Sequence, residues 1–278
     1  MGKEMQRVRV AFQGERGAYS EAAAVAFFGE KITPVPCESF DDVFTQVEGG
    51  ESDYGVVPIE NSLAGSIHRN YDLLLRHQLF IVGELNLRIA HHLIALPGVK
   101  VEDVKRVYSH PQALAQCERS LAALGDVEKV PTYDTAGSVR MLKDQGIYDG
   151  AAIASRRAAE IYRMSILASD FEDNSQNYTR FLALHPQEVV PEGPAKTSIV
   201  FSVENVPGVL FKCLSVFALR DIDLTKIESR PLQGRPWEYF FYLDFTGSMQ
   251  EERCCNAINH LQEITIFFRN LGSYPRAT

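Results

Sequence analysis

Residues 8–28 read VRVAFQGERGAYSEAAAVAFF and contain a strand, a polar turn and a helix within one short stretch. The apolar run from Val8 to Phe12 is typical of a buried strand. The turn that follows contains Gly14 and Gly17, and Ser20 to Phe28 has the spacing of a helix. A strand followed directly by a helix is the repeating unit of an α/β fold.

The same order of elements recurs as far as residue 185. The strands expected in this region, besides the first, are Tyr54–Ile59, Val104–Tyr108, Val130–Tyr133 and Ala151–Ala154. The helices expected there are Ser20–Phe28, Phe40–Val47, Pro111–Leu124 and Thr135–Asp144. Repeated strand–helix units predict largely parallel sheets, and such sheets bind ligands outside the carboxyl ends of their strands.

The C-terminal part of the chain has a different order of elements. Residues 185–194 read HPQEVVPEGP, a proline- and glycine-rich stretch typical of a linker. After it we expect strands at Thr197–Val203, Ile222–Ser229, Trp237–Phe245 and Ile264–Phe268, helices at Pro207–Leu219 and Met249–Leu261, and a turn at Pro231–Pro236. This βαββαβ order is that of a ferredoxin-like domain. The sequence therefore predicts a domain at residues 1–185, a linker at 186–196 and a second domain at 197–278.

Composition narrows the class of protein. The chain has 278 residues, of which 45% are hydrophobic, and 28 Lys and Arg stand against 36 Asp and Glu, for a net charge of −8. Nucleic-acid binding needs clustered basic residues, and this acidic chain has no such cluster. No apolar run approaches the roughly 20 residues that span a membrane. An anionic substrate is still compatible, because the local field of a cleft decides that.

The cysteines and the first residues bear on the compartment. Cys37, Cys117, Cys213, Cys254 and Cys255 are odd in number and lack the spacing of a zinc site. Five reduced thiols are the simpler interpretation. Met1–Gln6 is short and polar, without the apolar core of an export signal, so we expect a cytoplasmic protein.

Small polar residues follow five of the expected strands and open the helices after them. They lie in the segments 13–20, 60–66, 109–112, 134–138 and 155–156. Helix capping alone explains any one of these segments. Five on one edge of a sheet predict converging helix N-termini, which suit carboxylates or phosphates. The Gly14-x-x-Gly17 loop matches neither the P-loop nor the dinucleotide fingerprint.

A second feature is the run NSQNYTRFLAL at residues 174–184, in which a polar loop enters a strand. Arg180 lies among apolar neighbours, where it either recognises a carboxylate or pairs with an internal acid. No histidine spacing matches a metal motif. His110, at an expected helix start, is the histidine placed nearest the expected cleft.

Six motifs of the chain resemble, in the same order, those of the prephenate dehydratase family. They are Gly14–Ser20, Pro58–Ser62, Ser109–Leu114, Asp134–Ala136, Ala152–Ser155 and Asn177–Phe181. The tail resembles the ACT domain of that family in Gly208-Val209-Leu210 and in Glu228–Pro231. The family's usual Gly-Ala-Leu is Gly-Val-Leu here, a departure that concerns effector affinity. The resemblance covers nearly the whole chain from Arg7 onward.

The resemblance implies an α/β catalytic domain of two subdomains, similar to periplasmic binding proteins, followed by the ferredoxin-like ACT domain. It implies a reaction without metal or cofactor, in which prephenate loses carbon dioxide and water to give phenylpyruvate. It further implies feedback inhibition by L-phenylalanine bound between paired ACT domains, and hence a homodimer or homotetramer.

The resemblance also assigns roles to residues. Thr179 is the expected proton donor or hydrogen-bond catalyst to the leaving hydroxyl, with His110 the next candidate, and Arg180 is the expected carboxylate clamp. The substrate-binding residues that it implies are Asn61, Ser62, Ser109, His110, Thr135, Ser155, Asn177 and Phe181. The effector-binding residues that it implies are Asn205, Pro207, Gly208, Val209 and Leu210, with Glu228, Ser229, Arg230 and Pro231 opposite.

Three other functions were weighed. An arogenate dehydratase would act on a substrate with an amino group in place of the keto group, and the sequence leaves that preference open. A non-catalytic amino-acid-binding protein could use the same two-lobed cleft. A phosphosugar or nucleotide enzyme would need a phosphate or metal motif, which the sequence lacks. The sequence also leaves open the oligomer size, the strength of inhibition and the orientation of the domains.

Overall fold

The computed structural model describes residues 7–232, 234 and 237–277. The predicted N-terminal segment Met1–Gln6, and Gln233, Arg235 and Pro236 of the predicted turn, lie outside the described residues. The chain forms two compact units. One consists of residues up to Ile67 together with Leu85–Phe181, and the other of His68–Glu84 together with Leu182–Thr278.

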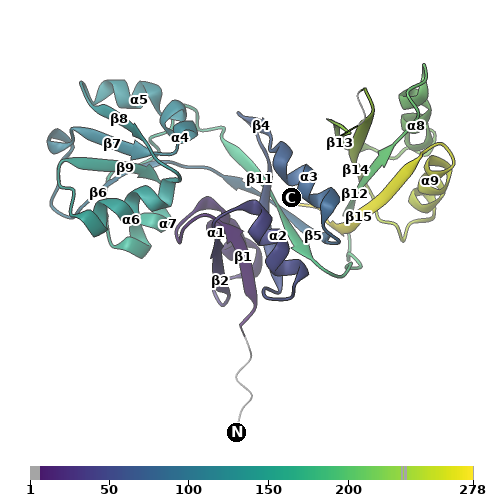
Figure 1. Cartoon of the computed structure of the whole chain (residues 1–278), viewed down its shortest axis with the longest axis horizontal. Coiled ribbons are helices and arrows are strands. Elements are labelled where there is room, and N and C mark those ends of the chain that lie inside the picture. Colours follow the sequence, from purple (N-terminus) through teal and green to yellow (C-terminus); the bar gives the residue numbers. More distant parts are fainter. Residues whose placement is uncertain (1–6, 233, 235–236, 278) are drawn as a thin grey trace, which may run out of the picture. The chain divides into compact units, whose positions relative to one another are not determined.

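The first unit begins with a sheet that contains both parallel and antiparallel strand pairs, where the sequence predicted largely parallel sheets (Figure 1). Its elements are β1 (Arg9–Gln13), α1 (Tyr19–Phe28), β2 (Thr33–Cys37), α2 (Phe40–Glu48), β3 (Tyr54–Asn61), β4 (Gly65–Ser66), β5 (Phe80–Arg88) and β11 (Tyr178–His185). The strand order is β2-β1-β3-β11-β5, with β4 paired to β3, and β1 pairs in parallel with both β2 and β3. β5 and β11 each continue into the second unit.

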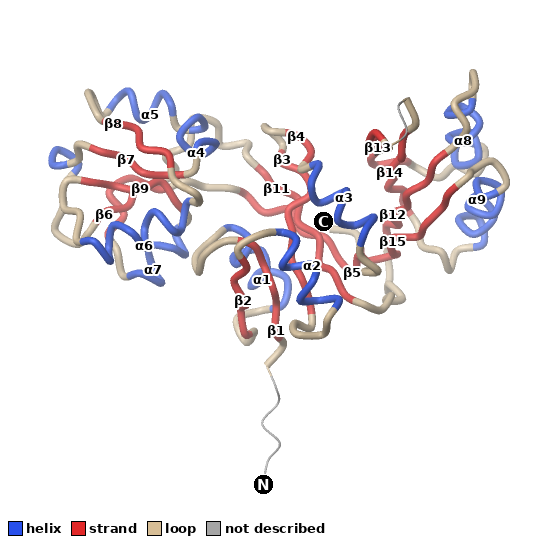
Figure 2. The backbone as a smooth tube through the Cα atoms, in the orientation of Figure 1, coloured by secondary structure: helices blue, strands red, loops and turns tan. Residues whose placement is uncertain are grey.

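A second sheet of the first unit has helices on both faces (Figure 2). Its elements are β6 (His92–Ala95), η1 (Val101–Asp103), β7 (Arg106–Ser109), α4 (Pro111–Gln116), α5 (Glu118–Ala123), β8 (Glu128–Pro131), α6 (Thr135–Gln145), β9 (Gly150–Ala154), α7 (Arg156–Tyr162) and β10 (Ser165–Ala168), in strand order β10-β6-β9-β7-β8. Ala151 and Ile153 of β9 pack with α4 and α5, and Ala152 and Ala154 with α6 and α7. Because successive side chains of β9 point to opposite faces of the sheet, this one strand contributes to the hydrophobic cores on both faces.

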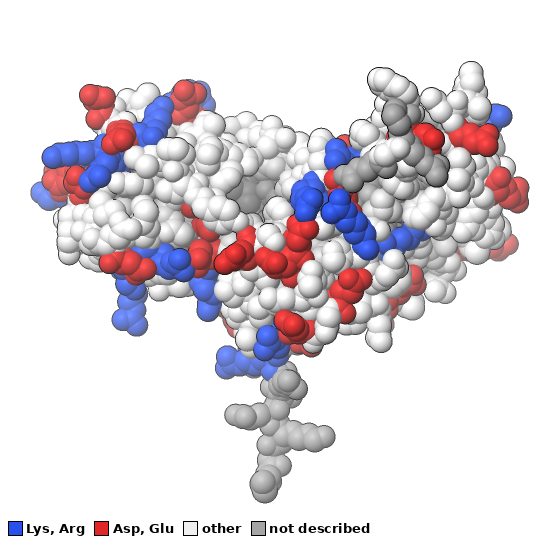
Figure 3. Space-filling model, viewed as in Figure 1, with Lys and Arg blue, Asp and Glu red and all other residues white. Residues whose placement is uncertain are grey.

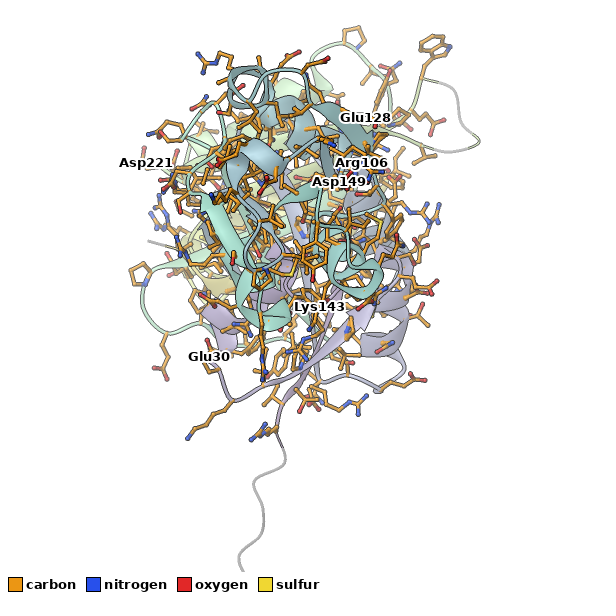
Figure 4. All side chains as sticks on the ribbon, turned by 90° about the vertical axis from the view of Figure 1, so that its left-hand side faces the viewer. Glu30, Arg106, Glu128, Lys143, Asp149 and Asp221 are labelled. Atoms are coloured by element: carbon orange, nitrogen blue, oxygen red, sulfur yellow. The ribbon has the colours of Figure 1, made fainter. Side chains whose placement is uncertain are left out.

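A half-exposed ion pair joins Arg106, the first residue of β7, to Asp149, the residue before β9. The Arg106 guanidinium donates to both carboxylate oxygens of Asp149, at 2.7 and 2.9 Å, and Figure 4 shows the two side chains next to each other. The hydrogen bond from Arg106 lowers the pKa of Asp149. On the face drawn in Figure 3, Lys and Arg are mixed with Asp and Glu.

The second unit contains a four-stranded antiparallel sheet. Its elements are α3 (His68–Arg76), β12 (Ala195–Ser202), α8 (Val209–Ala218), β13 (Leu224–Pro231), β14 (Tyr239–Thr246), α9 (Glu252–Gln262) and β15 (Phe267–Pro275), and the strand order is β13-β14-β12-β15. α8 and α9 share one core with the sheet. The hydroxyl of Tyr242 on β14 donates to the carbonyl of Tyr71 on α3, and Arg269 on β15 donates to the carbonyls of Leu74 and Leu75 near the end of α3.

The α/β class and the βαββαβ order expected from the sequence are confirmed, and the differences concern individual elements and their ends. The helix predicted at 111–124 is two helices that meet at Cys117. Asp173 explains the break, since its carboxylate accepts the backbone N–H groups of Arg119 and Ser120 and thus caps α5. The helix predicted from Pro207 begins at Val209, because Gly208 adopts a left-handed conformation with φ 79°.

The last strand and the second strand differ for other reasons. The last strand was predicted at 264–268, but β15 runs from Phe267 to Pro275. A register shift in its pairing with β12 interrupts the alternation of inward and outward side chains, so the sequence pattern does not reveal the strand. β2 was not predicted, because two prolines interrupt it. β2 lies at the edge of its sheet, where a missing N–H leaves no ladder bond unmade. Among the described residues, no helix is long and apolar enough to cross a membrane.

Gly17 places the loop after β1 against α7. The carbonyl of Gly17 accepts from the Ser155 hydroxyl at 2.6 Å, and its backbone has φ 90°. A Cβ at this position would lie 2.6 Å from the Cα of Ala158, a distance that side chains do not tolerate. A glycine is therefore required here both by conformation and by space.

We expect Gly17→Ala to lower the melting temperature far more than Gly29→Ala. Gly29 has φ 84° and nothing within 4 Å of an added Cβ, so both variants share the cost of an alanine at positive φ, about 1–3 kcal/mol. The clash with α7 adds about 1–3 kcal/mol only at Gly17. Differential scanning calorimetry of the two variants measures the difference. Equal melting temperatures would contradict the close packing of this loop on α7.

Candidate active site

A cavity of about 560 Å³ opens in the first unit. Gln13 and Gly14, where β1 ends, form part of its wall, and Asn61, the last residue of β3, forms another part. Thr179 and Phe181 of β11 also line it. The cavity thus lies outside the carboxyl ends of strands, where ligands bind in open α/β sheets.

The beginnings of three helices contribute to the wall. Tyr19 opens α1, His110 caps α4, and Asp134 and Thr135 begin α6. α1 has no side-chain cap, since Ala18 precedes it. Among the described residues that line the cavity, none is Lys or Arg. Backbone N–H groups and helix dipoles are therefore the positive groups that this wall offers to an anion.

Thr179 is buried and receives a hydrogen bond from Asn61. The Asn61 side-chain nitrogen lies 2.9 Å from the Thr179 hydroxyl oxygen and 2.8 Å from the side-chain oxygen of Asn177. The Asn61 side-chain oxygen accepts the backbone N–H groups of Leu63 and Ala64, at 3.1 and 2.9 Å. Because backbone N–H groups can only donate, the orientation of the Asn61 amide is fixed.

This orientation leaves the hydroxyl hydrogen of Thr179 for another acceptor. A hydroxyl has one hydrogen to donate, and Asn61 uses a lone pair of the oxygen, not the hydrogen. Within the part of the chain that the structure describes, Asn61 is the hydrogen-bond partner of the Thr179 side chain. The hydrogen of Thr179 is thus available to a molecule in the cavity.

Polar side chains continue from Asn61 in a chain of hydrogen bonds. Asn177 donates to the side-chain oxygen of Gln116 at 3.0 Å, and that oxygen lies 2.9 Å from Nε2 of His91. On the other side of the ring, Nδ1 lies 2.7 Å from the Tyr19 hydroxyl. Burial lowers the pKa of His91, so this ring is neutral near pH 7.

Gln116, His91 and Tyr19 were not among the site residues predicted from the sequence. Gln116 carried a usable signal, since it follows Gln112 by four residues on one helix face, and both line the cavity. His91 and His92 carried none, because two adjacent histidines do not reveal which of them faces a cleft.

Four predicted substrate-binding residues line the cavity, namely Asn61, His110, Thr135 and Phe181. Asn177 lies directly behind Asn61 and is fully buried. The hydroxyls of the other three predicted residues form hydrogen bonds with backbone groups, and these residues do not line the cavity. Ser109 donates to the carbonyl of Ile153, Ser155 caps α7, and Ser62 bridges the backbone of Gln176 and Tyr178.

Arg180 is not among the residues that line the cavity, although Thr179 and Phe181 on either side of it are. The reason is the alternation of side chains along β11, which turns neighbouring residues to opposite faces. The structure therefore gives the predicted carboxylate clamp no cavity position, and that role stays a prediction.

The predicted effector residues lie in the second unit. Asn205, Pro207 and Gly208 are exposed in the turn before α8, and Val209 and Leu210 begin that helix half-buried. On β13, Ser229 and Pro231 are exposed.

The other two β13 residues contact α3. The Glu228 carboxylate lies 3.3 Å from Nε2 of His68, and Arg230 donates to Asp72 at 3.1 Å. Two charged residues of the predicted effector motif are thus bound to a helix of the same unit. Among the described residues, no group of three or more His, Cys, Asp and Glu could hold a metal ion.

Two family models match the chain. The model described as "Prephenate dehydratase" matches residues 10–189, and the model described as "ACT domain" matches residues 197–253. The chain is 54% identical to "Arogenate dehydratase/prephenate dehydratase 2, chloroplastic" of Arabidopsis thaliana over 284 residues, which are 97% of this chain and 73% of that protein.

Two solved structures are similar over nearly the whole chain. One is described as a prephenate dehydratase from Arthrobacter aurescens in complex with L-Phe, with a TM-score of 0.89, 34% identity, and coverage of 97% of this chain and 90% of that one. The other is described as "GqqA- a novel type of quorum quenching acylases", with a TM-score of 0.89, 33% identity, and coverage of 97% and 98%. The chain belongs to the prephenate dehydratase family and carries an ACT domain after the dehydratase region.

Proposed function

We propose that this chain converts prephenate to phenylpyruvate, carbon dioxide and water, without a metal or cofactor. The observation that carries the proposal is the Thr179 hydroxyl, which Asn61 orients at the wall of a cavity lined by helix N-termini. Prephenate has two carboxylates and a ring hydroxyl. The helix N-termini suit an anion, and the hydroxyl hydrogen of Thr179 suits the leaving group.

Thr179 acts as the donor to the departing ring hydroxyl. As the C–O bond breaks, the hydroxyl of Thr179 gives a hydrogen bond or proton to the leaving oxygen, and water forms. A threonine hydroxyl is a weak acid, so negative charge that develops on its oxygen needs support. The N–H of Asn61, already 2.9 Å from that oxygen, supplies this support without rearrangement.

The two carboxylates of the substrate require different surroundings. The carboxylate of the side chain is retained, so it benefits from the N–H groups at the start of α1. The ring carboxylate leaves as neutral carbon dioxide, so strong binding there would oppose the reaction. The apolar part of the wall, which includes Pro58, Ile89 and Phe181, suits the group that loses its charge.

We expect Thr179→Val, which keeps the shape of the side chain and removes the hydroxyl, to lower kcat roughly 10²- to 10³-fold. Thr179→Ser, which keeps the hydroxyl, should stay within about tenfold of the unchanged enzyme. Phenylpyruvate formation from prephenate, followed by its absorbance, measures both. Thr265→Val is a matched control, because Thr265 is half-buried in the second unit and its hydroxyl bonds locally to the carbonyl of Gln262.

Near-normal turnover by Thr179→Val would remove Thr179 as the donor. His110, which also lines the cavity, would then be the next residue to change.

Arogenate is the alternative substrate, and the printed name of the Arabidopsis relative contains both activities. The two substrates differ only in a keto or amino group on the side chain. Purified protein should be assayed with each, and kcat/KM compared. A higher value with arogenate would change the substrate and keep the mechanism, whereas no turnover of either by folded protein would favour a non-catalytic amino-acid-binding protein.

For regulation, we propose a catalytic domain at residues 1–185, a linker at 186–196 and an ACT domain at 197–278 that binds L-phenylalanine. Gly208 precedes α8 with a left-handed backbone and no neighbour within 4 Å of an added Cβ, which leaves room for a ligand close to the main chain. The N-terminus of α8 suits the effector's carboxylate. The similar Arthrobacter structure is named as a complex with L-Phe.

We expect Gly208→Ala to weaken L-phenylalanine binding roughly tenfold, because an alanine resists the left-handed conformation by about 1–2 kcal/mol and displaces the first turn of α8. Isothermal titration calorimetry measures the Kd. Gly125→Ala is the control, since Gly125 has φ 92°, equally open space and a place in the first unit. An unchanged Kd for Gly208→Ala would remove this turn from the effector site.

Two further properties belong to the proposal. Binding of the effector between paired ACT domains requires at least a homodimer, and light scattering with and without L-phenylalanine tests whether the chain is a dimer or a tetramer. The cytoplasm is the proposed compartment. The printed name of the Arabidopsis relative places that protein in the chloroplast, so cell fractionation with an antibody to this chain is the test.

A further inference from the structure

The hydrogen-bond chain behind Thr179 has a direction that can be deduced from its backbone end. The Asn61 side-chain oxygen accepts from Leu63 and Ala64, so its nitrogen faces the side-chain oxygen of Asn177. The nitrogen of Asn177 must then face Gln116, and the Gln116 oxygen is the acceptor there at 3.0 Å. Each amide in the series is oriented by the one before it.

The same oxygen of Gln116 lies 2.9 Å from Nε2 of His91. A carbonyl oxygen can only accept a hydrogen bond, so Nε2 must carry a hydrogen. The ring is neutral because burial lowers its pKa, and a neutral imidazole has only one N–H. Nδ1 of His91 is therefore a bare lone pair.

Tyr19 closes the series at its other end. Its hydroxyl lies 2.7 Å from Nδ1 of His91 and 2.9 Å from the carbonyl of Ala90. With Nδ1 an acceptor, the one phenolic hydrogen of Tyr19 is shared between the carbonyl of Ala90 and the ring. Burial raises the pKa of Tyr19, so this hydrogen is retained throughout the neutral range.

We propose that Tyr19 and His91, the latter as its Nε2–H tautomer, are positioning residues that hold Gln116 and Asn177 in the one orientation compatible with Asn61. The opposite tautomer would set a ring lone pair against the Gln116 oxygen at 2.9 Å and favour a flipped Gln116 amide. That flip would set the Gln116 nitrogen against the nitrogen of Asn177, and a compensating flip of Asn177 would set its nitrogen against that of Asn61. The effect on catalysis rests on the proposed role of Thr179, whereas the tautomer does not.

His91 and Tyr19 also line the cavity, so direct substrate binding is the competing role. The carboxylate of Glu172 accepts a hydrogen bond from the backbone N–H of His91 at 2.8 Å. This bond does not involve the imidazole ring. Glu172 also receives a hydrogen bond from Arg88. Among the described residues, the ring nitrogens of His91 thus contact Tyr19 and Gln116.

The direct test is the tautomer itself. Long-range ¹H–¹⁵N correlation spectra of the full chain labelled with ¹⁵N-histidine distinguish the two neutral tautomers and the imidazolium, and His91→Gln assigns the resonance. We expect neutral Nε2–H for His91 at pH 7.5, and a partial shift toward Nδ1–H in Tyr19→Phe, where the ring loses its donor. An Nδ1–H tautomer or a charged ring in the unchanged protein would overturn the proposal.

Kinetics separate positioning from substrate binding. We expect His91→Leu to lower kcat roughly tenfold or more with KM changed less than about threefold, and His91→Gln, whose amide can donate to Gln116, to recover most of the loss. His92→Leu is the matched control. His92 is the adjacent buried histidine, and among the described residues its Nδ1 has no hydrogen-bond partner.

The outcomes distinguish the two proposals. A raised KM with an unchanged kcat in His91→Leu would make His91 a binding residue and overturn its positioning role. Equal losses in His91→Leu and His91→Gln would do the same. If the unchanged protein turns over neither prephenate nor arogenate, the proposed function fails, while the spectra still decide the tautomer.

Discussion

The carboxamide of Asn61 cannot flip, and the chemistry of the cavity depends on that constraint. Asn61 is the last residue of β3, and the chain turns immediately after it, so that the N–H groups of Leu63 and Ala64 point back at its side-chain oxygen. A local turn thus determines which end of the amide faces Thr179. The strand supplies the position of Asn61, the turn supplies the orientation of its amide, and the role proposed for the hydroxyl of Thr179 depends on both.

The strand and helix types were predictable because the periodicity of apolar residues is strong in this chain. In two of the places where the sequence misled, the explanation lies in a distant part of the chain. The helix at 111–124 breaks at Cys117 because Asp173, more than fifty positions later, caps the second half. β2 carries two prolines and still pairs, because it lies at an edge, which only the assembled strand order reveals.

The candidate site was predictable only in part, because local sequence patterns reveal some of its residues and distant contacts determine the others. Polar residues after strand ends could be found in the sequence, and Asn61, His110 and Thr135 do line the cavity. Ser109 and Ser155 have the same local signature, yet their hydroxyls are occupied by the carbonyls of Ile153 and Gly17. No local pattern distinguishes these two cases. The contacts among Tyr19, His91 and Gln116 were out of reach, since they join residues that are far apart in the chain.

The positive groups in the wall of the cavity are main-chain N–H groups, and this limits how far pH or a single substitution can alter them. These groups do not ionise in the range where histidine or lysine would, so their own contribution to the attraction for carboxylates stays the same when the surroundings become more acidic or more alkaline. Only proline lacks the N–H, so most single substitutions leave the donors in place. The capacity to hold an anion is therefore a property of the path of the chain, and the side chains around it are free to vary toward one substrate or another.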